Sequence, residues 1–383
     1  MKQNYRKLGE YIQPVDIRNS DLRVSRLLGL SIEKCFIESI ANTIGTDFRP
    51  YKIVKKGQFA YGPVTSRNGD KITIALLEEP ECIISSSYAV FEITDTSKLL
   101  PEYLMLWFSR PEFDRYARFK SHGSVREIFD WDEMCRVELP VPDLTEQQCI
   151  VNAYNTVDRR IRLLQQINEK LDATAQLQLE KFLNDSSIKK LTVKIGEISD
   201  VKGGKRLPLG SDLIEQKNSH PYIRIRDLKE NCFVMLNDEF LFVDDETQKE
   251  IARYITNTND LLISIVGTIG LTAIVHESLN NANLTENCVK LTNMKSLLPE
   301  YVLMYLRSKE GQYAISQATV GAVQAKLPLK NIQNLDIPYF EESIMNHYNV
   351  FLKNIFSIIS ENIEEIDKLQ NLKQLIISRI SGM

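Results

Sequence analysis

The sequence predicts an α+β protein in which two similar mixed domains alternate with two long helices. The chain of 383 residues is long enough for more than one domain. A stretch of about 190 residues occurs twice, and each copy ends in a long segment with a helical apolar stripe. We expect the two helices to pair as an antiparallel coiled coil, which gives the chain a pseudo-two-fold internal repeat.

The repeat rests on several matches that share one offset. Pro101 and Pro299, each in a Leu-Pro-Glu-Tyr segment, lie 198 residues apart. The same offset relates Gly123–Arg126 to Gly321–Gln324, and a Leu-Pro pair at 139–140 to an Ile-Pro pair at 337–338. Matches over such a distance in one register indicate a duplicated domain followed by a helix, because arrays of stacked repeats have much shorter units.

Each copy ends in a helix-forming segment. Residues 145–183 and 343–380 contain neither glycine nor proline, and apolar residues recur there every three or four positions. Thr145-Glu146-Gln147-Gln148 fits a capping box, which predicts Thr145 as the N-cap. A helix of about 38 residues is roughly 57 Å long and its narrow apolar stripe needs a partner. The expected partner is the other long helix, and burial of each stripe on its own domain is the alternative.

The segments ahead of the helices have mixed character. Lys71–Leu77 and Asp260–Val266 have the composition of buried strands, whereas Glu102–Phe108 and Glu300–Arg307 have that of helices. The predicted boundaries are 1–143 for the first domain, 144–186 for the central helix, 187–340 for the second domain and 341–383 for the C-terminal helix.

Composition excludes several classes of protein. No apolar run approaches the roughly 20 residues that span a bilayer, and the N-terminus has no signal-peptide pattern, so we expect a cytoplasmic protein. The six cysteines form no Cys-x-x-Cys pair and the four histidines are far apart, so we expect reduced, mostly buried thiols and no metal site. The net charge of −4 does not by itself indicate nucleic-acid binding, although residues 202–206 carry three positive charges.

Motifs of catalysis are missing. The sequence contains no glycine-rich phosphate loop, no His-Glu-x-x-His and no Gly-x-Ser-x-Gly. The Asn/Asp-Pro-Pro-aromatic motif with which amino-methyltransferases hold a flipped base is also absent. We therefore expect neither an active site nor a cofactor in this chain.

Polar loops are the candidate nucleic-acid contacts. Arg and Asn form paired hydrogen bonds with guanine and adenine edges, whereas Ser, Thr, Lys and backbone amides suit phosphates. The alternation in Tyr222–Arg226 predicts two arginines on one side of a strand, and Gly203-Gly204 is expected to expose backbone amides. Ordinary polar turns are the alternative for each loop. The candidate DNA-binding residues are Thr65, Ser66, Arg67, Asn68, Ser86, Tyr88, Lys120, Ser124 and Arg126 in the first domain, and Lys202, Gly203, Gly204, Lys205, Arg206, Arg224, Arg226, Thr268, Gln324 and Lys326 in the second.

Together these features resemble the specificity subunits of type I restriction-modification systems. The resemblance covers essentially the whole chain and rests on the Leu-Pro-Glu-Tyr helix starts, the two glycine loops, the helix that begins near Thr145, Tyr222–Leu228 and Gly267–Gly270. Before residue 99 the first copy departs from the second, since it has no Gly-Gly loop and no clear counterpart of Tyr222–Leu228. The two domains are therefore expected to read different sequences.

The resemblance implies a division of labour. Two target-recognition domains each read one half of a split, asymmetric DNA sequence, and the helices separate them. Two methyltransferase subunits bind this frame, bring S-adenosylmethionine and flip an adenine, and restriction subunits add ATP- and Mg-dependent translocation and cleavage. Three alternatives remain open: a specificity subunit of a related non-type-I system, an assembly scaffold that does not read DNA, and an enzyme with an unrecognised active site.

Overall fold

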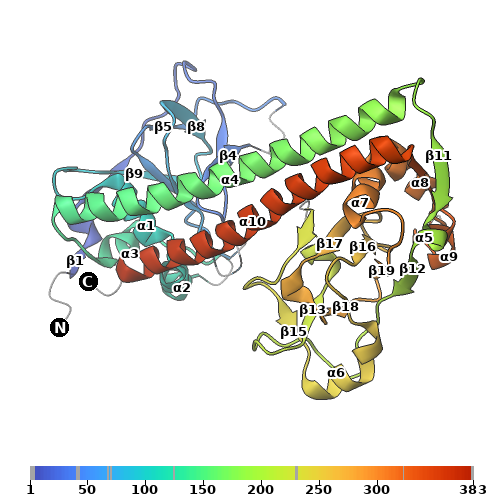
Figure 1. Cartoon of the computed structure of the whole chain (residues 1–383). Helices are drawn as coiled ribbons and strands as arrows, with labels where there is room; N and C mark the ends of the chain where they lie inside the picture. The colour runs from blue at the N-terminus through green and yellow to red at the C-terminus, as the bar shows by residue number, and fades with distance from the viewer. Residues whose placement is uncertain are drawn as a thin grey trace. The chain divides into compact units, whose positions relative to one another are not determined.

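The computed structural model describes the whole chain except residues 1–4, 40–43, 67–68, 70, 124–125, 229–231, 322 and 381–383. Contacts divide the chain into two units: residues 1–161 with 368–383 form the first, and residues 162–367 form the second. Two helices, α4 (Leu144–Asn184) and α10 (Glu342–Ile380), each contribute one end to each unit (Figure 1).

The first unit is built around a four-stranded antiparallel sheet in the order β2-β9-β6-β7. Three two-stranded pairs, β1-β10, β3-β4 and β5-β8, accompany it. Its core is aromatic, with the rings of Phe59 and Phe91 stacked at 4.9 Å and Phe108 packed edge-on against both. The elements are β1 (Tyr5–Lys7), η1 (Leu8–Glu10), β2 (Ile12–Val15), β3 (Leu28–Leu30), β4 (Phe36–Glu38), β5 (Lys52–Lys55), β6 (Phe59–Tyr61), β7 (Ile74–Leu76), β8 (Glu81–Ile84), β9 (Ala89–Ile93), α1 (Pro101–Phe108), α2 (Pro111–Lys120), α3 (Trp131–Arg136) and β10 (Glu138–Pro140).

The second unit holds a five-stranded sheet in the order β12-β19-β16-β17-β14 and a three-stranded sheet, β15-β13-β18. A separate pair, β11-β20, joins the start of this segment to its end. The elements are β11 (Leu191–Lys194), α5 (Ile195–Ile198), β12 (Asp200–Gly203), β13 (Pro221–Ile223), η2 (Ile225–Asp227), β14 (Phe233–Val234), β15 (Leu241–Phe242), α6 (Asp245–Ile251), η3 (Ala252–Tyr254), β16 (Leu261–Ser264), β17 (Thr272–Val275), η4 (Glu277–Leu279), β18 (Asn283–Leu284), β19 (Cys288–Thr292), α7 (Pro299–Arg307), α8 (Lys309–Ala318), α9 (Leu329–Gln333) and β20 (Asp336–Tyr339).

The duplication is visible in the elements and in their contacts. Helices α1, α2 and α3 begin 198 residues before α7, α8 and α9, respectively. The hydroxyl of Tyr103 donates to the carbonyl of Pro140 (3.1 Å), and that of Tyr301 donates to the carbonyl of Pro338 (2.7 Å). The sheet orders β2-β9-β6-β7 and β12-β19-β16-β17 also correspond. The common frame therefore extends upstream of residue 99, where the two sequences no longer match.

Helices α4 and α10 are antiparallel within each unit. In the second unit Asn362 donates to Asn168 (2.7 Å), and the hydroxyl of Tyr348 donates to the carbonyl of Ala175 (2.8 Å). Residue numbers thus fall along one helix as they rise along the other. Figure 1 shows the two helices side by side. The bounds of both helices agree with the segments predicted from the absence of glycine and proline.

The first unit contains the other ends of the same two helices. There Lys373 of α10 forms an ion pair with Asp158 of α4, and its ammonium lies 4.8 Å from the ring centroid of Tyr154. Val151 of α4 and Ile380 of α10 belong to the core of this unit. Each apolar stripe therefore packs both on the partner helix and on the adjoining β-rich segment. The two predicted modes of burial, on the other long helix and on the helix's own domain, occur together.

The predicted N-cap of α4 is wrong by two residues. Asp143, not Thr145, accepts a hydrogen bond from the Glu146 amide (2.9 Å), as a residue at the N-cap does. Gln147 has a different role, since it is fully buried (0 % exposed). Its side-chain oxygen Oε1 accepts from the Leu100 N–H (2.9 Å), and its Nε2 donates to the carbonyls of Lys98 and Pro142 (2.8 Å each). These bonds join the start of α4 to the start of α1.

Replacing Gln147 with methionine is expected to lower the free energy of unfolding by about 2–4 kcal/mol, because buried backbone groups lose their partners. Met345 occupies the equivalent position of the second copy, so the side-chain volume suits the frame. The exposed neighbour Gln148 provides the control, and Gln148→Met is expected to change stability by less than about 0.5 kcal/mol. Denaturant unfolding measures both, and equal effects would contradict the role given to Gln147.

The six cysteines differ in exposure. Cys82, Cys232 and Cys288 are buried free thiols, whereas Cys35 and Cys149 are exposed. The expectation of mostly buried thiols therefore holds for only half of them.

Within the described part of the chain, no helix combines the length and apolar character that a membrane crossing requires.

Candidate nucleic-acid interface

In the first unit two candidate loops lie together. His122 and Ile128 form a bridge that closes the loop after α2, and Ile128 also bridges to Val64 in the loop after β6. Gly123 has φ +141°, and a Cβ there would lie 2.1 Å from the carbonyl oxygen of Arg126. Only glycine fits this turn, which explains its position in the motif.

The described candidates of the first unit differ in exposure. Thr65 is buried (1 % exposed), and its hydroxyl donates to that of Ser121 (2.8 Å). Thr65 thus connects the two loops and does not face solvent. Ser66, Ser86 and Arg126 are exposed, while Lys120 and Tyr88 are half-buried. The predicted contacts Arg67, Asn68 and Ser124 lie outside the described residues.

The second unit repeats this pair of loops. Val320 bridges to Lys326, and Lys326 bridges to Val266 in the loop after β16. Gly321 has φ +95° and lies 198 residues after Gly123. The side chains of Thr268, Gln324 and Lys326 are exposed. The frame thus presents the same two loops in both units, with different side chains on them.

The Gly-Gly segment does not expose its amides as predicted. The N–H of Gly204 donates to the carbonyl of Cys288 (3.0 Å), and that of Lys205 donates to the carbonyl of Leu284 (2.8 Å). Glycine is needed at 204 because a Cβ would lie 2.0 Å from the carbonyl oxygen of Thr285. The segment therefore offers the exposed side chains of Lys202, Lys205 and Arg206, and not backbone donors.

The predicted strand with two arginines on one side is also wrong. Strand β13 ends at Ile223, and the 3-10 helix η2 begins at Ile225. Arg224 forms a two-bonded pair with Asp227 (2.9 and 2.8 Å), and the two side chains are only 14 % and 7 % exposed. Arg224 therefore stabilises the turn, while Arg226 is exposed.

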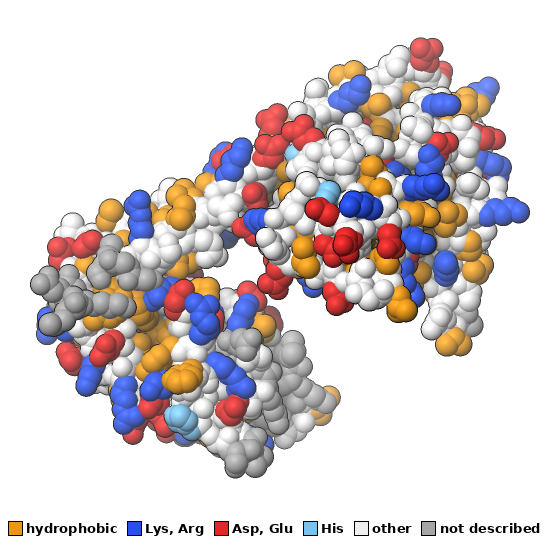
Figure 2. Space-filling model, turned by 90° about the horizontal axis from the view of Figure 1, so that it is seen from below, with side chains coloured by type: hydrophobic (Ala, Val, Ile, Leu, Met, Phe, Trp, Pro, Cys, Tyr) orange, Lys and Arg blue, Asp and Glu red, His pale blue; other side chains and the backbone are white. Residues whose placement is uncertain are grey.

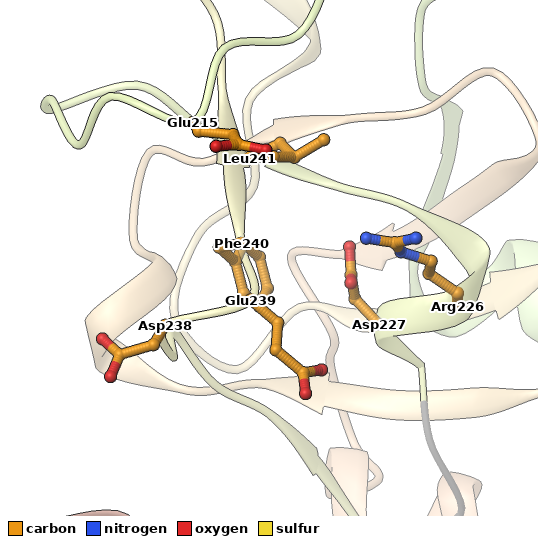
Figure 3. Close-up of a pocket in the computed structure, with 7 residues that line it drawn as sticks. All are labelled: Glu215, Arg226, Asp227, Asp238, Glu239, Phe240 and Leu241. Carbon is orange, nitrogen blue, oxygen red and sulfur yellow. The ribbon is translucent and has the colours of Figure 1, made fainter. Parts of the chain in front are cut away.

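Arg226 faces an acidic cavity of about 620 Å³. Figure 3 shows its guanidinium beside Asp227, with Asp238 and Glu239 on the segment opposite. Glu215 completes the acidic lining. Carboxylates repel phosphates but accept hydrogen bonds from the amino groups of cytosine and adenine. The cavity therefore suits base edges better than the DNA backbone.

The sequence reasoning missed the segment Thr285-Glu286-Asn287. The carbonyl of Asn287 accepts from the Ile265 N–H (2.8 Å), and Glu286 accepts from the Arg206 side chain (2.8 Å). Burial disfavours the ionised carboxylate of Glu286, but hydrogen bonds, above all from Arg206, outweigh it and lower its pKa. The segment precedes β19 as Ser86–Tyr88 precedes β9, but the two sequences do not match there, so only the correspondence of the strands relates them.

Basic and acidic side chains share the same surface in the view of Figure 2. In Figure 2 basic and acidic side chains are interspersed on the face of each unit that is seen. This distribution agrees with the net charge of −4. The face seen therefore offers no broad basic field, and the loops are the candidate contacts on it.

Two segments of the chain, residues 42–173 and 189–375, match the family described as "Type I restriction modification DNA specificity domain". The HindI specificity subunit of Haemophilus influenzae is 26% identical over 136 residues, which are 35% of this chain and 29% of that protein. The MjaIX specificity subunit of Methanocaldococcus jannaschii is 21% identical over 337 residues, 80% of this chain and 73% of that one. The crystal structure of the type I S subunit from M. genitalium has the same fold, with a TM-score of 0.58, 14% identity and coverage of 98% and 95%.

The chain therefore has an α+β fold with two β-rich domains and two long helices that pack together, and two of its segments match a DNA specificity domain. The chain belongs to the type I restriction-modification specificity-subunit family, whose role is recognition of the DNA target. Subunits of this family are non-catalytic and carry no cofactor of their own. The predicted family, fold class and lack of an active site are thereby confirmed.

Proposed function

We propose that this chain reads an asymmetric, two-part DNA target with one loop set in each unit. The observation that carries the proposal is the pair of bridged loops found in both units. At matched positions these loops bear unlike side chains, Arg126 against Gln324 and Ile128 against Lys326. One frame with two sets of reading groups is what two unlike half-sites require.

The proposal assigns a part to each predicted segment. Residues 1–143 and 187–340 act as target-recognition domains, and 144–186 and 341–383 act as spacers. Two methyltransferase subunits bind this frame and supply S-adenosylmethionine, and restriction subunits supply the ATP- and Mg-dependent steps, all in the cytoplasm. The names of the HindI and MjaIX relatives support a type I assembly, and the long paired helices provide a frame for one.

Methylome sequencing of a host that expresses this chain with its methyltransferase tests the proposal. The expected result is a modified motif with two unlike specific parts separated by unspecified bases. A single continuous motif, or a palindromic pair of half-sites, would contradict it.

Arg226→Ala is expected to weaken binding to one half-site by about 1–3 kcal/mol, because a lost base contact has that magnitude. Binding of the complex with its methyltransferase is measured on the target duplex and on duplexes with either half-site altered. The variant should lose discrimination at one half-site and retain it at the other. Lys249→Ala, an exposed cation of α6, is the matched control and should leave both unchanged. An equal loss on every duplex would mean that Arg226 contacts a phosphate.

A further inference from the structure

The fold of the second unit brings together three side chains that are distant in the sequence. His276 follows β17, Glu277 opens η4, and Glu364 lies on α10. One ligand atom from each lies within 4.8 Å of the others, and His276 Nε2 is 3.4 Å from Glu364 Oε1. The imidazole is 11 % exposed and the Glu364 side chain 41 %, so the group lies at an accessible edge.

The imidazole ring is held in place by its neighbours. Phe233 packs edge-on against the His276 ring at 6.2 Å and against Phe356 of α10 at 5.8 Å. The Ser278 hydroxyl lies 3.1 Å from His276 Nδ1 and accepts from the Leu236 N–H (3.1 Å). When Nδ1–H donates to Ser278, the lone pair of Nε2 is free on the side where the Glu364 carboxylate lies at 3.4 Å. In metal sites, a hydrogen bond to the second ring nitrogen of a histidine fixes the tautomer and holds the ring in the orientation that metal binding needs.

A competing contact favours the other tautomer. The Ser278 N–H lies 3.3 Å from Nδ1, and donation along this line places the proton on Nε2. Metal binding therefore has to exchange this long backbone contact for the shorter one to the hydroxyl.

An acidic cavity of about 320 Å³ adjoins the group and provides access to it. His276 and Glu277 line this cavity together with Glu300 and Glu361, and Lys353 is the lysine in its lining. Within the described residues, the buried oxygen Oε2 of Glu300 has no hydrogen-bond donor. Three carboxylates against one lysine give this cavity a negative lining, which favours a cation over an anion.

We propose that His276, Glu277 and Glu364 bind a divalent transition-metal ion of the zinc type. An imidazole with two carboxylates favours zinc, cobalt or nickel over magnesium and calcium, which prefer oxygen ligands alone. Metal–ligand bonds of about 2.0–2.2 Å require the exposed Glu277 side chain to turn inward. The ion would join the end of β17 to α10 and thereby stabilise the five-stranded sheet against the helix.

The full chain, stripped with a chelator, is titrated with Zn²⁺ by calorimetry and with Co²⁺ by visible absorption. We expect one saturable ion per chain and a rise in melting temperature on binding. His276→Ala and Glu364→Gln should each weaken binding at least tenfold. His347→Ala, an exposed histidine of α10, is the control and should bind as the unaltered chain does.

Either of two results would overturn the proposal: no saturable binding by the unaltered chain, or equal affinity in His276→Ala. Glu364→Gln changes a partly exposed side chain, so it keeps the test decisive if His276→Ala fails to fold. Ser278→Ala leaves the three ligands in place. It should weaken Zn²⁺ binding and alter the Co²⁺ spectrum if the hydroxyl orients the ring.

Discussion

Gly204→Ala is expected to separate β12 of the five-stranded sheet from β18 of the three-stranded sheet in the second unit and, on the proposed function, to abolish reading of one half-site. A Cβ at this position would lie 2.0 Å from the Thr285 carbonyl oxygen and 2.4 Å from that of Leu284. Both are backbone atoms, so no side-chain rotation relieves the contact. The segments must separate, and the hydrogen bond from Lys205 to Leu284 is lost with them. We expect a cost of about 3 kcal/mol or more.

The neighbouring glycine provides a matched control. The nearest atom to a Cβ at Gly203 is a methyl carbon of Leu329 at 3.8 Å, which is an ordinary contact. Gly203→Ala should therefore change stability by less than about 1 kcal/mol. Thermal unfolding and binding to duplexes with one altered half-site measure both variants. Equal behaviour of the two would show that close backbone approach is not the reason for the Gly-Gly pair.

The long helices and the repeat could be predicted because their signals are local or repetitive. The apolar stripes and the absence of glycine and proline predict α4 and α10 almost to the residue. The offset of 198 predicts that α1 and α7 correspond. The predicted N-cap of α4, Thr145, lies two residues after the observed one, Asp143. Asp143 and Thr145 both suit an N-cap, and the tertiary bonds of Gln147 decide where the helix begins.

The candidate site was less predictable because its contacts are tertiary. Periodicity predicts a strand through Arg224, but its pair with Asp227 turns the chain into a 3-10 helix instead. Thr65 is typical of an exposed polar turn, yet the approach of a second loop buries it against Ser121. His276 and Glu364 are far apart in the sequence, and only the packing of η4 beside α10 brings them together. Such pairings have no local signature.

Lengthening both helices by one turn is expected to change the gap in the DNA target and to leave the half-sites unchanged. Four residues inserted after Ile161 and four after Asp367 fall where each helix passes from one unit to the other. The pair Asp158–Lys373 lies on one side of both points and the pair Asn168–Asn362 on the other, so both pairs are kept when the two helices lengthen equally. The insertion adds about 6 Å, which corresponds to roughly two base pairs.

This result depends on the paired helices behaving as a rigid spacer, and insertion into one helix alone tests that requirement. A single insertion shifts the register of α4 against α10, separates pairs such as Asn168 with Asn362, and should lower stability and DNA binding together. The double insertion should retain the stability and move the gap in the modified motif. An unchanged gap in the double-insertion methylome would mean that the DNA adapts to the protein by bending, and the helices would then not set the spacing.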